Sequence, residues 1–128
     1  KDGKLIVFSL VPQNGIGKTV NNEDRFHGFT ILGKSKVSDP VDRAAILKGL
    51  AQSVRDNQGF VAACFNPRHG IRYTKGDQVI DLVICFECAS ARAYGMNNDK
   101  GFLLTEAASP AFNSFLDKKK IKRDQKDD

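Results

Sequence analysis

The sequence predicts an α+β domain in which an antiparallel sheet of about five to six strands carries two helices packed on one face. Short runs rich in β-branched and aromatic residues alternate with turns that contain Gly, Pro or Asn, which is typical of strands. Asp39-Pro40 and Ser109-Pro110 each place a proline where the first turn of a helix tolerates it. The resulting order, β-β-α-β-β-β-β-α, favours antiparallel pairing.

The first half of the chain supplies two predicted strands and the longer helix. Residues 5–11 form a β-rich run that ends at Pro12, and residues 26–37 resemble a second strand. A helix follows from the Asp39 cap to about Asn57, because apolar residues recur there at helical spacing. These residues are Ile46, Leu47, Leu50, Ala51 and Val54.

The second half supplies the other predicted strands and the last helix. Residues 60–65 are apolar and predict a strand, and residues 69–88 predict a hairpin around a central glycine turn. Odd positions on the first arm of this hairpin and even positions on the second are apolar, so these positions face the core. Residues 102–104 add a short strand, and the last helix, opening at Ser109-Pro110, carries large apolar residues on one face. These residues are Phe112, Phe115 and Leu116.

Length and charge predict one domain, residues 1–116, followed by a charged tail, residues 117–128. The 128-residue chain has a formal net charge of +5, and its tail holds six Lys or Arg and four Asp. The basic run from Lys118 to Arg123 predicts weak contact with an anionic surface. No aromatic residues lie among these charges, so we expect no nucleic-acid partner. The longest apolar run is too short to predict a transmembrane segment.

A cluster of cysteines and histidine is the candidate functional centre, because all three cysteines and one of the two histidines fall within 25 residues. Cys64, His69, Cys85 and Cys88 provide four thiol and imidazole side chains, the last two in a Cys-x-x-Cys motif. Ligands of these types and in this number suit a tetrahedral zinc ion. We therefore predict a binding or structural module built around a zinc-type metal site with these four ligands.

The pattern of the predicted hairpin opposes a regular four-ligand site. In an extended strand, residues three apart point to opposite faces, so Cys85 and Cys88 would point apart. The predicted register places His69 and Cys88 on the core face, and Cys64 and Cys85 on the other face. The metal prediction therefore requires the chain to depart from regular pairing, for example by a bulge near Glu87.

Three alternatives stay open from spacing alone. A disulfide between Cys64 and Cys85 would staple the domain and leave Cys88 as a buried thiol. Reduced core cysteines with His69 as a hydrogen-bonded structural residue would form no ligand site. A thiol-dependent enzyme would use Cys64 or Cys88 with His69, although we identify no catalytic motif. The other histidine, His27, is interpreted as a structural turn residue.

Residues 26–34, 62–70 and 81–88, which include the motifs CFNPRHG and ICFEC, resemble an uncharacterised family of small bacterial proteins. The similarity extends to residues 109–112 and so covers most of the chain. It implies an exported or cell-envelope setting, with the cytoplasm as the alternative, and this setting favours a disulfide. The resemblance assigns no catalytic role. The chain begins at Lys1 without an initiator Met or a signal sequence, which we interpret as processing or trimming of a longer protein.

Overall fold

A computed structural model describes residues 3–12, 25–59, 65–95 and 100–124 of the chain. Within these residues seven strands, two α-helices and one short 3-10 helix follow one another along the sequence. In order they are β1 (Lys4–Leu10), β2 (Arg25–Phe26), β3 (Phe29–Lys36), α1 (Pro40–Asp56), β4 (His69–Lys75), β5 (Gln78–Cys85), β6 (Ser90–Tyr94), β7 (Lys100–Leu103), η2 (Glu106–Ala108) and α2 (Ser109–Lys118). None of the described helices is long and apolar enough to cross a membrane.

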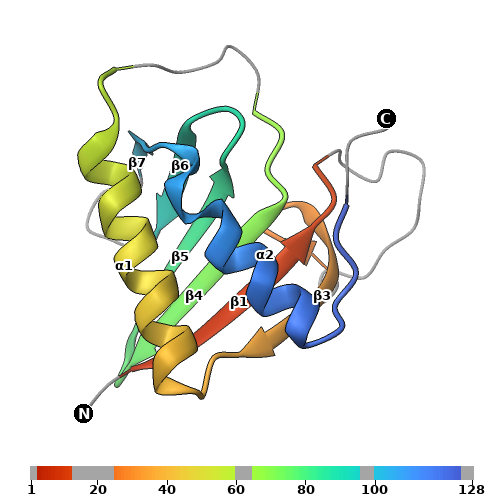
Figure 1. The fold of residues 1–128 in the computed structure, drawn as a ribbon. Helices are drawn as coiled ribbons and strands as arrows, with labels where there is room; N and C mark the ends of the chain where they lie inside the picture. Colours follow the sequence, from red (N-terminus) through yellow and green to blue (C-terminus); the bar gives the residue numbers. More distant parts are fainter. Residues whose placement is uncertain (1–2, 13–24, 60–64, 96–99, 125–128) are drawn as a thin grey trace.

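The strands form one antiparallel sheet in the order β2-β3-β1-β4-β5-β6-β7. Both α-helices lie across the same face of this sheet (Figure 1). The predicted class, an antiparallel α+β domain with two helices, is therefore confirmed. The predicted number of about five to six strands is too low, because the described sheet contains seven.

Two strands, β2 and β6, were not predicted. In each case a turn next to the strand lies within sequence that resembles a continuous strand. His27 and Gly28 have φ angles of 50° and 93°, and this pair of positive values makes the two-residue turn that separates β2 from β3. The run predicted as one strand over residues 26–37 is therefore a hairpin. The strand predicted over residues 60–65 lies mostly outside the described residues, and Phe65 itself is not in a strand.

The predicted register of the β4–β5 hairpin is confirmed. Ile71 pairs with Leu82 and His69 pairs with Ile84, so the odd positions of β4 and the even positions of β5 face the helices. Val83 points the other way into a second cluster, so apolar residues are buried on both faces of the sheet. The helix-side core is built mainly from Leu5, Val7, Ile46, Ile71, Ile84, Phe112, Phe115 and Leu116.

Helix α1 begins as predicted but packs along a narrower stripe than its apolar spacing suggests. The Asp39 side chain accepts a hydrogen bond from the Val41 N–H at 2.8 Å, as expected of an N-cap. Ile46 is fully buried, whereas Leu47 and Val54 are 40% and 45% exposed. The helix is held at its other end by hydrogen bonds from η2 and its preceding residue to Ser53.

The segment after α2 returns to the sheet. Ser9 in β1 donates a hydrogen bond to the Lys122 carbonyl at 2.7 Å. Ile121 packs against the helix-side core and approaches Gly33 so closely that a Cβ there would lie 2.7 Å from its side chain. The predicted charged tail, residues 117–128, therefore begins within α2, and its residues 119–124 pack on the domain and bring Asp124 within 3.3 Å of Arg68.

Candidate functional site: a pocket beside the disulfide turn

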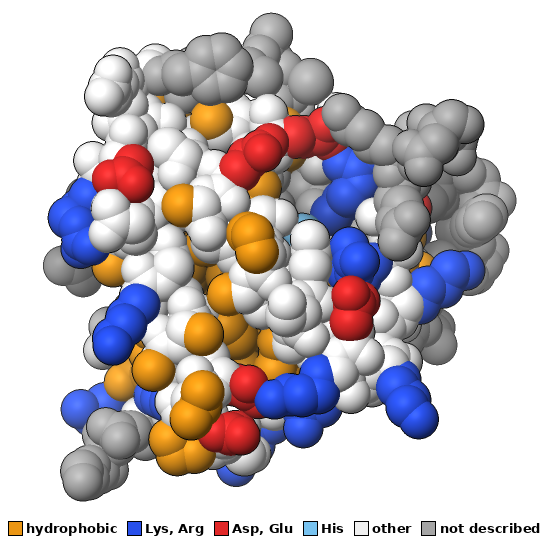
Figure 2. Space-filling model, viewed as in Figure 1, with side chains coloured by type: hydrophobic (Ala, Val, Ile, Leu, Met, Phe, Trp, Pro, Cys, Tyr) orange, Lys and Arg blue, Asp and Glu red, His pale blue; other side chains and the backbone are white. Residues whose placement is uncertain are grey.

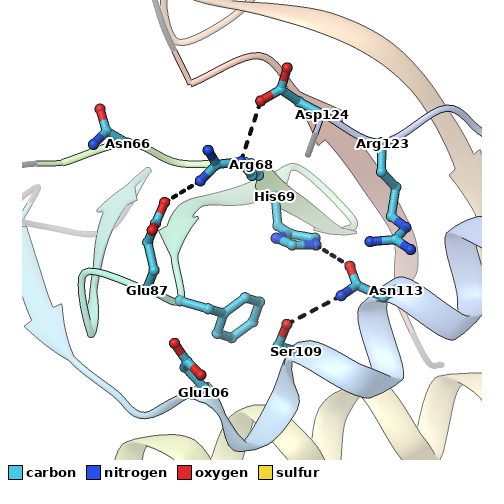
Figure 3. Close-up of a pocket in the computed structure, with 10 residues that line it drawn as sticks. Asn66, Arg68, His69, Glu87, Glu106, Ser109, Asn113, Arg123 and Asp124 are labelled. Atoms are coloured by element: carbon cyan, nitrogen blue, oxygen red, sulfur yellow. Dashed lines mark hydrogen bonds and ion pairs between the residues drawn. The ribbon is translucent and has the colours of Figure 1, made fainter. Parts of the chain in front are cut away.

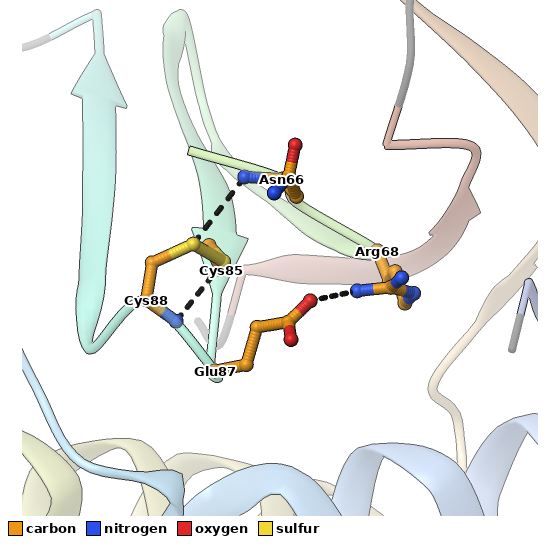
Figure 4. Close-up of a disulfide and its surroundings, with 5 residues drawn as sticks. All are labelled: Asn66, Arg68, Cys85, Glu87 and Cys88. Carbon is orange, nitrogen blue, oxygen red and sulfur yellow. Dashed lines mark hydrogen bonds and ion pairs between the residues drawn. A yellow bond between two sulfur atoms is a disulfide. The ribbon is translucent and has the colours of Figure 1, made fainter. Parts of the chain in front are cut away.

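Strand β5 ends at Cys85, and residues 86–89 turn the chain into β6. A disulfide joins Cys85 to Cys88 across this turn, with their Cα atoms 5.1 Å apart (Figure 4). The Cys88 N–H donates to Cys85 Sγ at 3.1 Å, and the Asn66 N–H donates to Cys88 Sγ at 3.3 Å. We refer to residues 85–89 as the disulfide turn.

The predicted disulfide between Cys64 and Cys85 is wrong, because Cys85 bonds to Cys88 instead. The prediction extended the second hairpin arm to residue 88, where residues three apart point to opposite faces. The structure closes a turn there, with Ala89 at a φ of 61°, and the turn brings the two sulfur atoms together. Cys88 is buried, as predicted, but it is not a free thiol.

The prediction of a zinc-type metal site is also wrong. Two of its four ligands are consumed by the disulfide, and the third, His69, is engaged through Nε2 with Asn113. Among the residues that the structure describes, no group of three or more His, Cys, Asp or Glu side chains could hold a metal ion. The fourth predicted ligand, Cys64, lies outside the described residues. The bonded Cys88 sulfur also removes the proposed Cys88–His69 nucleophilic pair.

A pocket of about 340 Å³ opens beside the disulfide turn, and we call it the turn pocket. His69, at the start of β4, and Phe86, from the disulfide turn, contribute its most buried side chains. Ser109 and Asn113, one turn apart on α2, line the opposite side (Figure 3). In Figure 2 this region is a hollow with acidic side chains along one rim and basic side chains along the other.

His69 is held rigidly and in one tautomer. His69 is only 7% exposed, and its ring makes edge contacts with Phe86 and Phe112, at centroid distances of 5.2 and 5.6 Å. Asn113 turns its Nδ2 towards Ser109 Oγ at 3.4 Å, so its Oδ1 faces His69 Nε2 at 2.7 Å as the acceptor. Nε2 therefore carries the proton. Nδ1 is an acceptor without a hydrogen-bond partner among the described residues.

Burial determines the protonation state of His69. Loss of hydration disfavours the imidazolium and lowers the pKa of His69 from 6.5 to about 4. The hydrogen bond to Asn113 raises this pKa, but the nearby positive charges of Arg123 and Arg68 lower it further. His69 is therefore a neutral ring at neutral pH, and it offers the turn pocket a lone pair rather than a charge.

Charged side chains surround the neutral histidine. Arg68 pairs with Glu87, and its Nε lies 3.3 Å from Asp124 Oδ2 without the alignment of a hydrogen bond. Arg123 makes a two-point contact with Asp117, at 2.8 and 3.2 Å. Glu106 is exposed and has no ion-pair partner within the described parts of the chain.

A second pocket of about 320 Å³ adjoins the turn pocket and extends towards the end of α1. The two pockets share Phe86, Glu87 and Glu106. Two of these three residues belong to the disulfide turn. The turn is therefore a wall common to both cavities.

A separate polar network lies on the other face of the sheet. Asp81 is 5% exposed, and its carboxylate accepts two hydrogen bonds from Arg72, both at 2.8 Å. His27 Nε2 lies 2.8 Å from the same carboxylate, and the ring stacks on Tyr94 at 3.9 Å. The sequence interpretation of His27 as a turn residue is correct for its backbone but missed this contact. The confirmed hairpin register, which places Arg72 opposite Asp81, could have revealed the first pair.

We expect Asp81→Asn to cost about 1–2 kcal/mol of stability, because charge-assisted hydrogen bonds are lost but Arg72 stays partly solvated. Burial raises the pKa of Asp81, yet the Arg72 and His27 hydrogen bonds outweigh it and hold that pKa below 3.8. This stabilisation is therefore complete above pH 3.8 and is lost as the pH falls through the folded-state pKa. Urea unfolding of both proteins, at pH values above and below 3.8, measures this stabilisation. A difference in unfolding free energy that stays constant down to low pH would contradict this assignment. His27→Asn isolates the contribution of the imidazole ring, because asparagine tolerates a positive φ.

Sequence reasoning found His69 but missed the residues that position it. Ser109 and Asn113 are four apart on a helix, so a polar pair beside a buried phenylalanine was a usable signal. Arg123 gave no such signal, because its segment was predicted to be a charged tail outside the domain. Comparison of the chain with protein-family models, with curated proteins and with solved structures finds no match.

Proposed function

We propose that this protein is a disulfide-stapled binding domain that takes a small polar ligand in the turn pocket. The observation that carries the proposal is the position of Phe86 and Glu87. These are the two residues between the bonded cysteines, and both line the pocket. The bond therefore fixes a wall of the cavity as well as the end of a strand.

An oxidising compartment suits this domain, because disulfides persist in exported proteins and are rare in the reducing cytosol. The resemblance to an uncharacterised family of small bacterial proteins implies an exported or cell-envelope setting and so supports the same compartment. We place the domain in the bacterial cell envelope. A pocket of about 340 Å³ is within the size range of small-molecule sites.

The disulfide contributes to binding through pre-organisation. It closes a short ring, which stabilises a domain by about 2 kcal/mol in the chain-entropy account. Glu87 within the ring pairs with Arg68, and Phe86 supports the His69 ring. A pocket whose walls are already fixed loses less conformational entropy when a ligand binds.

Removing the bond tests the proposal. We expect Cys85→Ala/Cys88→Ala to lose about 2 kcal/mol of unfolding free energy, and pocket ligands to bind at least about tenfold more weakly. A fragment library screened by NMR, with the side-chain amide signals of Asn66 and Asn113 as pocket reporters, supplies those ligands.

Cys64→Ala is the matched control, because Cys64 lies outside the disulfide, and it should retain the fragments. Alkylation of denatured protein without reductant should modify one cysteine, and all three after reduction. Three modified cysteines in protein secreted into an oxidising medium would contradict the staple. If no fragment shifts either amide signal, the pocket has no binding role.

A further inference from the structure

The turn pocket carries charges of both signs, and some of them are paired: Arg68 pairs with Glu87, and Asp124 lies 3.3 Å from Arg68 Nε. Glu87 and Glu106 lie on one side, and Arg123 lies on the other, with the His69 ring between them (Figure 3). Its described lining holds two arginines and three carboxylates, and the neutral His69 leaves a net charge of −1. The whole chain carries +5, so the pocket is an acidic site on a basic protein.

The acidic side offers acceptors to a cationic group. Glu87 is already paired with Arg68, whereas Glu106 has no charged partner among the described residues. His69 adds a second acceptor, because its Nε2 proton is used by Asn113 and its Nδ1 faces no described donor. An ammonium group carries three donors and no acceptor, so it can satisfy a carboxylate and an imidazole lone pair together.

The basic side offers donors to an anionic group. Arg123 uses Nε and Nη2 to hold Asp117, which leaves its Nη1 group for another acceptor. Arg68 is paired with Glu87, and its Nε lies 3.3 Å from Asp124, so Arg123 supplies the donor for an anionic group. A carboxylate is the planar acceptor that guanidinium groups bind best.

We propose that the ligand of the turn pocket is a small zwitterion with an ammonium and a carboxylate group, of the size of a free amino acid or a dipeptide. This inference rests on the proposed function. A purely anionic ligand would face Glu87 and Glu106, and a purely cationic one would leave the Nη1 group of Arg123, which Asp117 does not use, without an acceptor. Among the described residues, no group of three or more His, Cys, Asp or Glu side chains could hold a metal ion, so the observations favour an organic ligand.

The test is a thermal-shift screen of the standard amino acids and glycylglycine at millimolar concentration, followed by calorimetry on each hit. For a hit, its N-acetyl form lacks the ammonium and its amide form lacks the carboxylate. We expect each blocked form to bind about tenfold more weakly or worse. Glu106→Gln should weaken the free zwitterion about tenfold and leave the N-acetyl form unaffected. Arg123→Gln should weaken the zwitterion and leave the amide form unaffected.

Asp77→Asn is the matched control, since it also removes one negative charge but lies in the exposed turn between β4 and β5, away from the pocket. It should bind every hit as the unmodified protein does. Equal binding of a hit and its amide form would overturn the zwitterion, as would a screen without hits. If library fragments still shift the Asn113 amide in that second case, the pocket is a binding site and only the ligand class is wrong. If neither screen gives a signal, the proposed function itself has failed.

Discussion

Replacing Phe112 with alanine is expected to lower the free energy of unfolding by about 3–5 kcal/mol, the largest effect of any change considered for this protein. The Phe112 side chain is fully buried on α2. Its ring makes edge contacts with His69 and Phe86, at centroid distances of 5.6 and 5.4 Å. Truncation would remove apolar burial and leave a cavity directly behind the turn pocket. Urea unfolding measures the loss.

Phe115→Ala provides the matched control for this change. Phe115 is 3% exposed on the same helix and belongs to the same core, but it makes no ring contact with His69 or Phe86 in the described structure. We expect a comparable loss of stability from both substitutions and weakened fragment binding from Phe112→Ala only. Phe112→Leu should retain most of the volume and cost about 1–2 kcal/mol. Equal effects of both alanine variants on pocket binding would show that Phe112 has only a general packing role.

The second large effect is a fall in stability between pH 6.5 and about 4, caused by His69. Burial lowers the folded-state pKa of this residue, so the unfolded chain takes up a proton in this range before the folded chain does. Stability is therefore complete above pH 6.5 and falls as the pH drops towards 4, below which the loss levels off. The pKa change from 6.5 to about 4 corresponds to about 3 kcal/mol.

His69→Gln isolates this contribution, because glutamine can still donate a hydrogen bond to Asn113 but does not titrate. Unfolding free energies of both proteins, measured from pH 4 to pH 7, give the difference free of other groups. We expect that difference to shrink steadily as the pH falls. A difference that stays constant across the range would mean that the pKa of His69 is the same in the folded protein as in the unfolded chain. NMR titration of the His69 ring gives the same pKa independently.

Periodicity predicted the parts of this fold in which side chains repeat regularly. The helix starts at Asp39 and Ser109 and the register of the β4–β5 hairpin depend on local rules of capping and alternation. The turns at His27-Gly28 and Ala89 depend instead on backbone angles that non-glycine residues seldom adopt. The apolar spacing of a strand-like run does not predict such a turn. For that reason two strands and the disulfide pairing were missed.

The candidate site was predictable only where its members are close in sequence. His69 and the Cys-x-x-Cys pair were found from their residue types, but their chemistry was misassigned, because a disulfide and a metal site use the same side chains. Asn113 and Arg123 come from the far end of the chain, and only the tertiary fold brings them to His69. Spacing carries no information about such contacts.

The hydrogen bond between Ser9 and Lys122 has a consequence for the order in which the molecule assembles. It joins positions 113 residues apart, so the loop it closes spans nearly the whole chain. Contacts of such long sequence separation form slowly, and this one cannot form on the ribosome until Lys122 has emerged. Arg123 and Asp124 directly follow Lys122 in the chain, and they complete the lining of the turn pocket. A nascent chain should therefore acquire its sheet first and its ability to recognise a ligand last.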